Sequence, residues 1–93
     1  AILALALVHH LAIGRNVPLG DVATWFARLA PEAIVEFVPK EDPMVRFLLS
    51  SREDVFPDYT IEGFRAAMGT VFDTVSETPL AESPRTMFHL RRR

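Results

Sequence analysis

The sequence opens with an unbroken apolar run, after which helix-like and strand-like hydrophobic patterns alternate. Residues 1–8 are all apolar, and His9 and His10 follow directly. The run is too short to cross a membrane, and no positively charged segment precedes it, so a signal peptide is not supported. It predicts a buried element. Its Ala and Leu content favours a helix, but strands buried on both faces are equally apolar throughout.

Three helices are predicted further along the chain. Apolar residues spaced by three and four form one stripe over residues 18–29, and Pro31 ends that helix. Asp42 is expected as the N-cap, and Pro43 as the first residue, of a short helix to residue 50 or 51. Thr60 is expected to cap a helix that ends near residue 69. The large side chains expected in the core from these helices are Trp25, Phe26, Phe64 and Met68.

The other segments predict strands. Residues 33–38 (AIVEFV) are β-branched, apolar and aromatic, and Pro39 closes them. Two late strands, residues 71–77 and 86–91, are joined by a loop too long for a tight hairpin. With the first run taken as a strand, this order predicts an α/β fold with early parallel strands and an antiparallel last pair. The first strand, apolar on both faces, is expected to need a neighbour on each side.

Length, charge and cysteine content narrow the class of protein. The 93 residues fit one domain. A net charge of -2 disfavours a nucleic-acid binder with a basic surface. The absence of cysteine excludes disulfides, thiolate metal sites and a cysteine nucleophile, and is compatible with a cytoplasmic location. Because the chain starts at Ala1 and not at a methionine, we expect a piece of a longer protein.

Four segments resemble the C-terminal half of class I S-adenosylmethionine-dependent methyltransferases. They are AILALALVHHL, IVEFVPKEDPMV, FPDYTIEGF and ESPRTMFHLRRR. In that family they would be the fourth strand, the fifth strand with its loop, the lead-in to the next helix, and an antiparallel seventh strand. The resemblance implies a partial Rossmann-like sheet of about four strands with about three helices. Two or three strands would be parallel and the last antiparallel, in the spatial order first–second–fourth–third.

The same resemblance implies a parent enzyme that transfers a methyl group from S-adenosylmethionine to an unidentified acceptor. The family's glycine-rich turn and ribose-binding acid are not in this chain, so residues 1–93 are expected to form the C-terminal part of a larger domain. Alone, they are expected to be inactive and to bind the cofactor weakly or not at all. The alternative is a non-catalytic α/β interaction module. The unpaired edge of the first strand is expected to self-associate, for example as a dimer.

Candidate site residues follow from the rule that open α/β sheets bind ligands beyond the carboxyl ends of parallel strands. His9 and His10 follow the first strand. One of them is expected to line the cofactor or substrate pocket and to act as a general base, with His9 as the candidate cofactor-binding residue. Alternatively, both histidines cap or hydrogen-bond the turn between the strand and the following helix. No metal site is expected, because no carboxylate accompanies the pair.

The second strand and its loop supply charged candidates. Glu36 lies among apolar residues, where a carboxylate needs a partner. It is either a catalytic or substrate-orienting group, or the partner of an arginine such as Arg85 or Arg91. Lys40 and Asp42 are candidates for a substrate-binding rim. Alternatively, Lys40 is a solvated charge and Asp42 is the cap of a helix.

Two further groups are given structural roles. The polar stretch of residues 52–59 is expected to be a loop, with Asp58 and Tyr59 packing at the surface. The three arginines at residues 91–93 are more typical of a solvated chain end than of a phosphate site.

Overall fold

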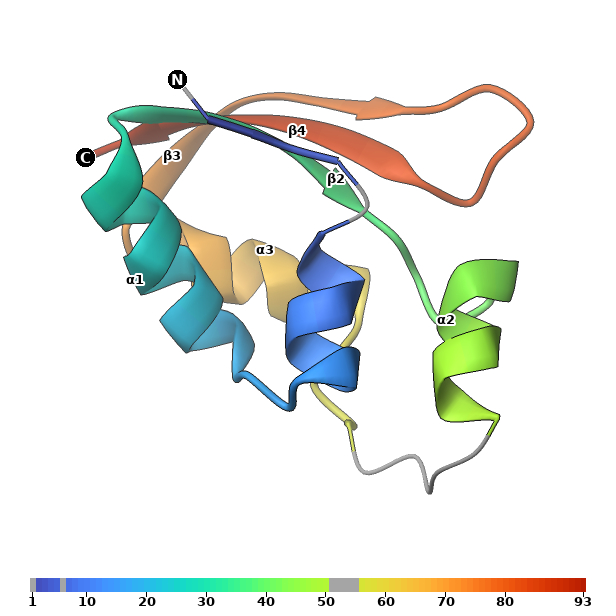
Figure 1. Ribbon diagram of the computed structural model, residues 1–93. Helices are drawn as coiled ribbons and strands as arrows, with labels where there is room; N and C mark the ends of the chain where they lie inside the picture. Colours follow the sequence, from blue (N-terminus) through green and yellow to red (C-terminus); the bar gives the residue numbers. More distant parts are fainter. Residues whose placement is uncertain (1, 6, 51–55) are drawn as a thin grey trace.

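A computed structural model describes residues 2–5, 7–50 and 56–93 (Figure 1). The predicted α/β class is confirmed. A π-helical turn, η1, adds one helical element to the three helices expected. The elements in chain order are β1 (Ile2–Ala4), η1 (His10–Gly14), α1 (Leu19–Leu29), β2 (Glu32–Phe37), α2 (Pro43–Leu49), α3 (Ile61–Gly69), β3 (Phe72–Pro79) and β4 (Thr86–Arg92).

Two helices begin at the caps that the sequence predicts. The Asp42 carboxylate accepts a hydrogen bond from the Met44 backbone N–H at 2.9 Å, which caps α2. The Thr60 hydroxyl accepts one from the Gly63 N–H at 3.0 Å, which caps α3. Gly63 is also required by space, because a Cβ there would lie 2.1 Å from the Asp58 carbonyl oxygen.

The four strands form one sheet in the order β1-β2-β4-β3, the spatial order that the sequence predicts. β1 and β2 are parallel, with Leu3 opposite Ile34. β4 runs antiparallel to both β2 and β3, so β1, β2 and β3 share one direction. The start of β4 therefore lies beside the end of β2, where Thr86 pairs with Phe37. The loop before β4 is thereby brought to the carboxyl end of the parallel pair.

All the helices lie on the same side of the sheet in Figure 1. Alternate strand residues point into this layer, and the core takes Ala33, Val35 and Phe37 from β2 together with Phe88 and Leu90 from β4. An aromatic cluster fills its centre, with Phe64 of α3 5.1 Å from Phe37 and 4.8 Å from Phe88 between ring centroids. The other face of the described sheet carries no helix.

Two expectations are wrong in detail. The initial apolar run does not form one long strand: β1 ends at Ala4 and the chain is helical from Val8. Apolar character alone could not separate a short strand from the helical turn that follows, because a short apolar run is compatible with either element. Trp25 is not a core residue but 47% exposed, and Leu29 in the same stripe is 53% exposed. The buried face of α1 is centred on the neighbouring positions, among them Phe26.

Candidate functional site

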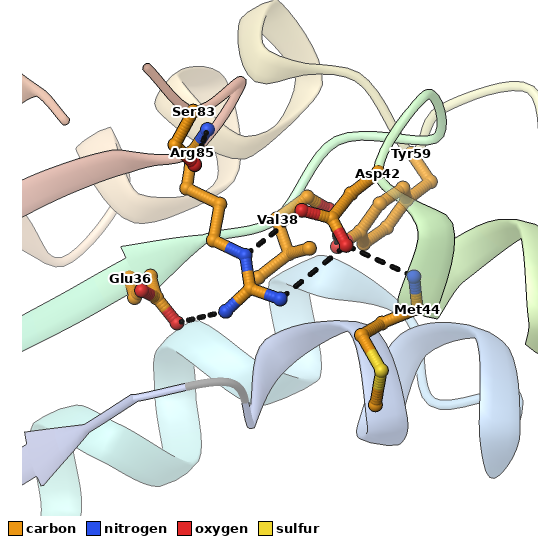
Figure 2. Close-up of polar contacts among 7 residues, drawn as sticks. All are labelled: Glu36, Val38, Asp42, Met44, Tyr59, Ser83 and Arg85. Atoms are coloured by element: carbon orange, nitrogen blue, oxygen red, sulfur yellow. Dashed lines mark hydrogen bonds and ion pairs between the residues drawn. The ribbon is translucent and has the colours of Figure 1, made fainter. Parts of the chain in front are cut away.

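The carboxyl end of the parallel strand pair carries a network of three charged side chains. Arg85, from the loop before β4, reaches across the end of β2 (Figure 2). Its Nε donates to Asp42 Oδ2 at 2.9 Å and its Nη2 to Asp42 Oδ1 at 3.3 Å. Its Nη1 donates to Glu36 Oε1 at 3.3 Å. Of the two arginines expected as partners of Glu36, the structure selects Arg85.

Asp42 has two roles at once. One of its oxygens caps α2 while the carboxylate binds Arg85, so α2 is tied to the β3–β4 hairpin through a single buried side chain. The hydrogen bond from Arg85 holds the pKa of Asp42 below its ordinary value, and the Met44 N–H adds to this effect. The carboxylate is therefore charged at neutral pH. The predicted N-cap role is confirmed.

His9 lies near enough to the same network for its charges to act on the imidazole, and the His9 side chain is fully buried. Neither ring nitrogen has a hydrogen-bond partner among the described residues. Burial, and then the neighbouring His10 and Arg85, lower the pKa of His9, while Asp42 and Glu36 oppose this shift. The imidazole is thus neutral at pH 7. A buried histidine with both nitrogens unpaired is unusual in a folded protein.

The remaining predicted residues lie at the rim. The exposed ring of His10 stands 4.3 Å from that of His9, centroid to centroid. Lys40 is half-buried, and its Nζ donates to the Phe56 carbonyl at 2.7 Å, which fastens the loop after β2 to the lead-in of α3. The structure thus brings His9, Glu36 and Asp42 together, and leaves His10 beside them at the surface.

Tyr59, like Trp25, lies where the sequence did not predict it. Of the predicted loop, residues 52–55 lie outside the described residues, and Tyr59 is buried instead of packing at the surface. Its hydroxyl donates to the Val38 carbonyl, and its ring stacks on Phe37 at 5.2 Å. Burial, with the nearby Asp42 carboxylate, raises the pKa of Tyr59. The signal in the sequence that indicates burial of Tyr59 is its large aromatic ring among polar loop residues.

A cavity of about 510 Å³ lies between the starts of α1 and α3, and it contains none of the predicted site residues. Within residues 2–5, 7–50 and 56–93, no three His, Asp or Glu side chains gather as a metal would need. None of the described helices has the length and apolar character required to cross a membrane.

Comparison with known proteins gives one clear similarity. The chain is 47% identical over 92 residues to the nodulation protein NoeA of Rhizobium meliloti (strain 1021). The match covers 99% of this chain but 19% of NoeA, so the chain spans about a fifth of its relative's length. No family model matches the sequence, and no solved structure matches it.

Proposed function

We propose that this chain forms the C-terminal part of an S-adenosylmethionine-dependent methyltransferase domain. The observation that carries the proposal is the network of His9, Glu36, Asp42 and Arg85 at the carboxyl end of the parallel strands. Open α/β sheets bind their ligands at this end. The proposal includes a cytoplasmic location, and it leaves the methyl acceptor open.

The topology supports the proposal. An antiparallel strand inserted between two strands of the opposite direction is the arrangement that the sequence resemblance implies, and the sheet has it. A π-helical turn directly follows His9, and such turns occur frequently at functional sites. The resemblance and the sheet order rest on different observations, since one comes from sequence segments and the other from strand pairing.

The residues of this network fit one side of a site for S-adenosylmethionine and its methyl acceptor. The unpaired nitrogens of His9 offer a buried polar group, which is the observation that favours a ligand here. S-adenosylmethionine, when bound, supplies an activated methyl group. His9 would hydrogen-bond the cofactor or the substrate, and, as a neutral imidazole, it would accept a proton. Arg85 keeps both carboxylates in place, and Lys40 and Asp42 would form the acceptor rim.

The experiment is isothermal titration of S-adenosylmethionine into three proteins. The first is this chain, the second is full-length NoeA, and the third is a NoeA chimera in which this chain replaces the matching 92 residues. We expect NoeA and the chimera to bind, and the isolated chain to bind weakly or not at all, because the glycine-rich turn lies outside it. No binding by NoeA or the chimera would refute the proposal.

A matched pair of histidine variants sharpens this test. His9→Gln in the chimera should lower the affinity for the cofactor or the substrate. His89→Gln is the control, because that side chain lies within β4 and its Nε2 pairs with Glu32 at 2.7 Å, at the amino end of β2 and therefore away from the network. If the two substitutions changed the affinity equally, His9 would not be part of the binding site.

A second candidate is a non-catalytic interaction module that self-associates through β1. The observation that favours it is the exposure of Leu3 and Leu5, 68% and 49%, at the edge of the sheet. Sedimentation equilibrium of the isolated chain at tens of micromolar distinguishes the two. A tight dimer, together with no cofactor binding by the chimera, would favour the module.

A further inference from the structure

The cavity of about 510 Å³ between the starts of α1 and α3 is separate from the polar network. One of its walls is the turn from η1 into α1, residues 16–20, and the other is the lead-in to α3, residues 56–59. These two stretches lie side by side at the bottom of Figure 1. None of the four described network residues lines the cavity. Its volume lies within the range of small-molecule sites, about 300–1,000 Å³.

Small residues leave this space open. Ala12 of η1 and Ala66 and Ala67 of α3 line the cavity, and so do Gly20 and Gly63 at the starts of the two helices. A Cβ added at Gly20 would meet no atom within 4 Å. The space therefore depends on the side chains around it, and larger residues at these positions would remove it.

Backbone contacts hold both walls in place. The Val17 N–H donates to the Leu11 carbonyl at 2.9 Å, which closes the turn before α1. The Thr60 N–H donates to the Asp58 carbonyl at 2.9 Å, and that carbonyl oxygen lies where a Cβ of residue 63 would have to be. The lead-in thus packs directly on α3 at Gly63. A ligand would enter a cavity whose walls are already formed, so its binding would cost little ordering of the chain.

One charged side chain lines the cavity. Asp58 is exposed, and its carboxylate has no hydrogen-bond or ion-pair partner in the part of the chain that the structure describes. Thr60, and not Asp58, caps α3. None of the described residues that line the cavity is basic. The carboxylate is therefore available to accept hydrogen bonds from a ligand, and its charge favours a cation.

The rest of the lining is mainly apolar and includes two aromatic residues. Phe56 is half-buried and Tyr59 is buried, and they lie on either side of Asp58 in the sequence. The Tyr59 hydroxyl already donates to the Val38 carbonyl, so this residue offers the cavity apolar surface. Aromatic rings attract cations through their faces. An ammonium group at Asp58 would thus gain from the carboxylate and from the rings, while an apolar body would fill the remaining space.

We propose that this cavity binds a small organic amine. The ammonium group of the ligand would lie at Asp58, and its apolar body would lie between α1 and α3 against the alanines of α3. The amide of Asn16, which also lines the cavity, would be a second polar contact. This inference goes beyond methyl transfer and does not require it.

The test compares three probes that share one body and differ in charge. Phenethylamine, phenethyl alcohol and phenylacetate are titrated into the NoeA chimera at pH 7, without S-adenosylmethionine, and binding is followed by saturation-transfer difference NMR. We expect the amine to bind, the neutral alcohol to bind about fivefold more weakly, as an exposed ion pair allows, and the anion to bind most weakly. An amine that does not bind, or that binds no better than the alcohol, would overturn the proposal.

Substitutions locate the bound amine. Asp58→Asn should weaken phenethylamine binding about fivefold and leave the alcohol unaffected. Asp21→Asn is the matched control, because Asp21 is an exposed acid in the first turn of α1 that does not line the cavity. Ala67→Leu should abolish binding of both probes by filling the space. Ala81→Leu adds the same volume at an exposed position outside the cavity and should change neither.

Thermal melts of each variant separate a lost site from a lost fold. Because the Asp58 carboxylate has no described partner, Asp58→Asn should keep the original midpoint, and it remains informative if Ala67→Leu does not fold. Equal weakening of the amine by Asp58→Asn and Asp21→Asn would overturn the proposal, as would unchanged binding in a folded Ala67→Leu variant. Cofactor titration has no part in these measurements, so their failure is distinct from failure of the methyltransferase proposal.

Discussion

Replacing Arg85 by Met tests whether one guanidinium holds the carboxyl end of the sheet together. The variant keeps a long unbranched side chain and removes three charged hydrogen bonds. Glu36 and Asp42 are 8% and 4% exposed, so their carboxylates lose a cation without gaining much water. Breaking a buried pair costs about 3–5 kcal/mol and an exposed pair about 0–1 kcal/mol. Because the Arg85 side chain is 24% exposed, we expect about 3 kcal/mol.

Urea denaturation at pH 7 measures this loss. With a slope of about 1 kcal/mol per molar urea, the unfolding midpoint should fall by about 3 M. Arg65→Met is the matched control, because the Arg65–Glu77 pair is as short, at 2.7 Å, but its side chains are 48% and 31% exposed. It should cost less than about 1 kcal/mol. Equal shifts for the two variants would refute the reasoning.

Acid provides an internal check on the same prediction. The pKa of Asp42 is lowered in the folded state, chiefly by its hydrogen bond from Arg85. The stability that this group contributes is therefore present above the unfolded-state pKa of 3.8 and is lost as the pH falls through the folded-state pKa. The difference between the original chain and Arg85→Met should narrow below about pH 4. A difference that stays constant down to pH 2 would mean that Asp42 is not its source.

Three further predictions concern neighbouring groups. Burial lowers the pKa of His9 below its ordinary 6.5, so the unfolded chain binds the proton first and stability should fall as the pH drops below about 6.5. Urea midpoints at pH 7.5 and 5.5 should differ less in His9→Leu. Gly63→Ala should lower the thermal midpoint, because its Cβ would lie 2.1 Å from a backbone oxygen, whereas Gly69→Ala meets nothing within 4 Å and should not. Tyr59→Phe should cost about 1 kcal/mol in urea unfolding, because a buried carbonyl loses its donor, and an unchanged midpoint would contradict this.

The parts of the fold that were predicted depend on local signals. The caps at Asp42 and Thr60 are short-range hydrogen bonds between neighbours in sequence, so residue type and spacing were enough to find them. The sheet order followed from the sequence resemblance. The division of the first apolar run into β1 and a helical turn was not predictable, because a short apolar run has no periodicity that separates a strand from a helix. The exposure of Trp25 depends on which elements pack beside α1, and no local pattern reports that.

The candidate site, like the fold, was predicted only where local signals or strand direction decide the position of a residue. His9 and Asp42 could be placed at the carboxyl end because strand direction decides it. The choice of Arg85 over Arg91 as the partner of Glu36 needed the register of β4, in which Thr86 pairs with Phe37. The burial of Tyr59 depends on a hydrogen bond to a residue 21 positions away. Long-range contacts of this kind have no signature in a single sequence.

The position of His9 in the polar network depends on β1. His9 follows the end of β1 by five residues, and only three paired residues fix β1 against β2. A slip of one residue would turn Leu3 to the opposite face and shift His9 relative to Glu36. A strand docked on the free side of β1 would supply a second ladder and hold the register from both sides. Such a strand would thus also hold His9 near Arg85, so the pKa of His9, followed by NMR titration, should differ between the isolated chain and the NoeA chimera. An identical pKa of His9 in the two proteins would show that the network holds His9 without a strand beside β1.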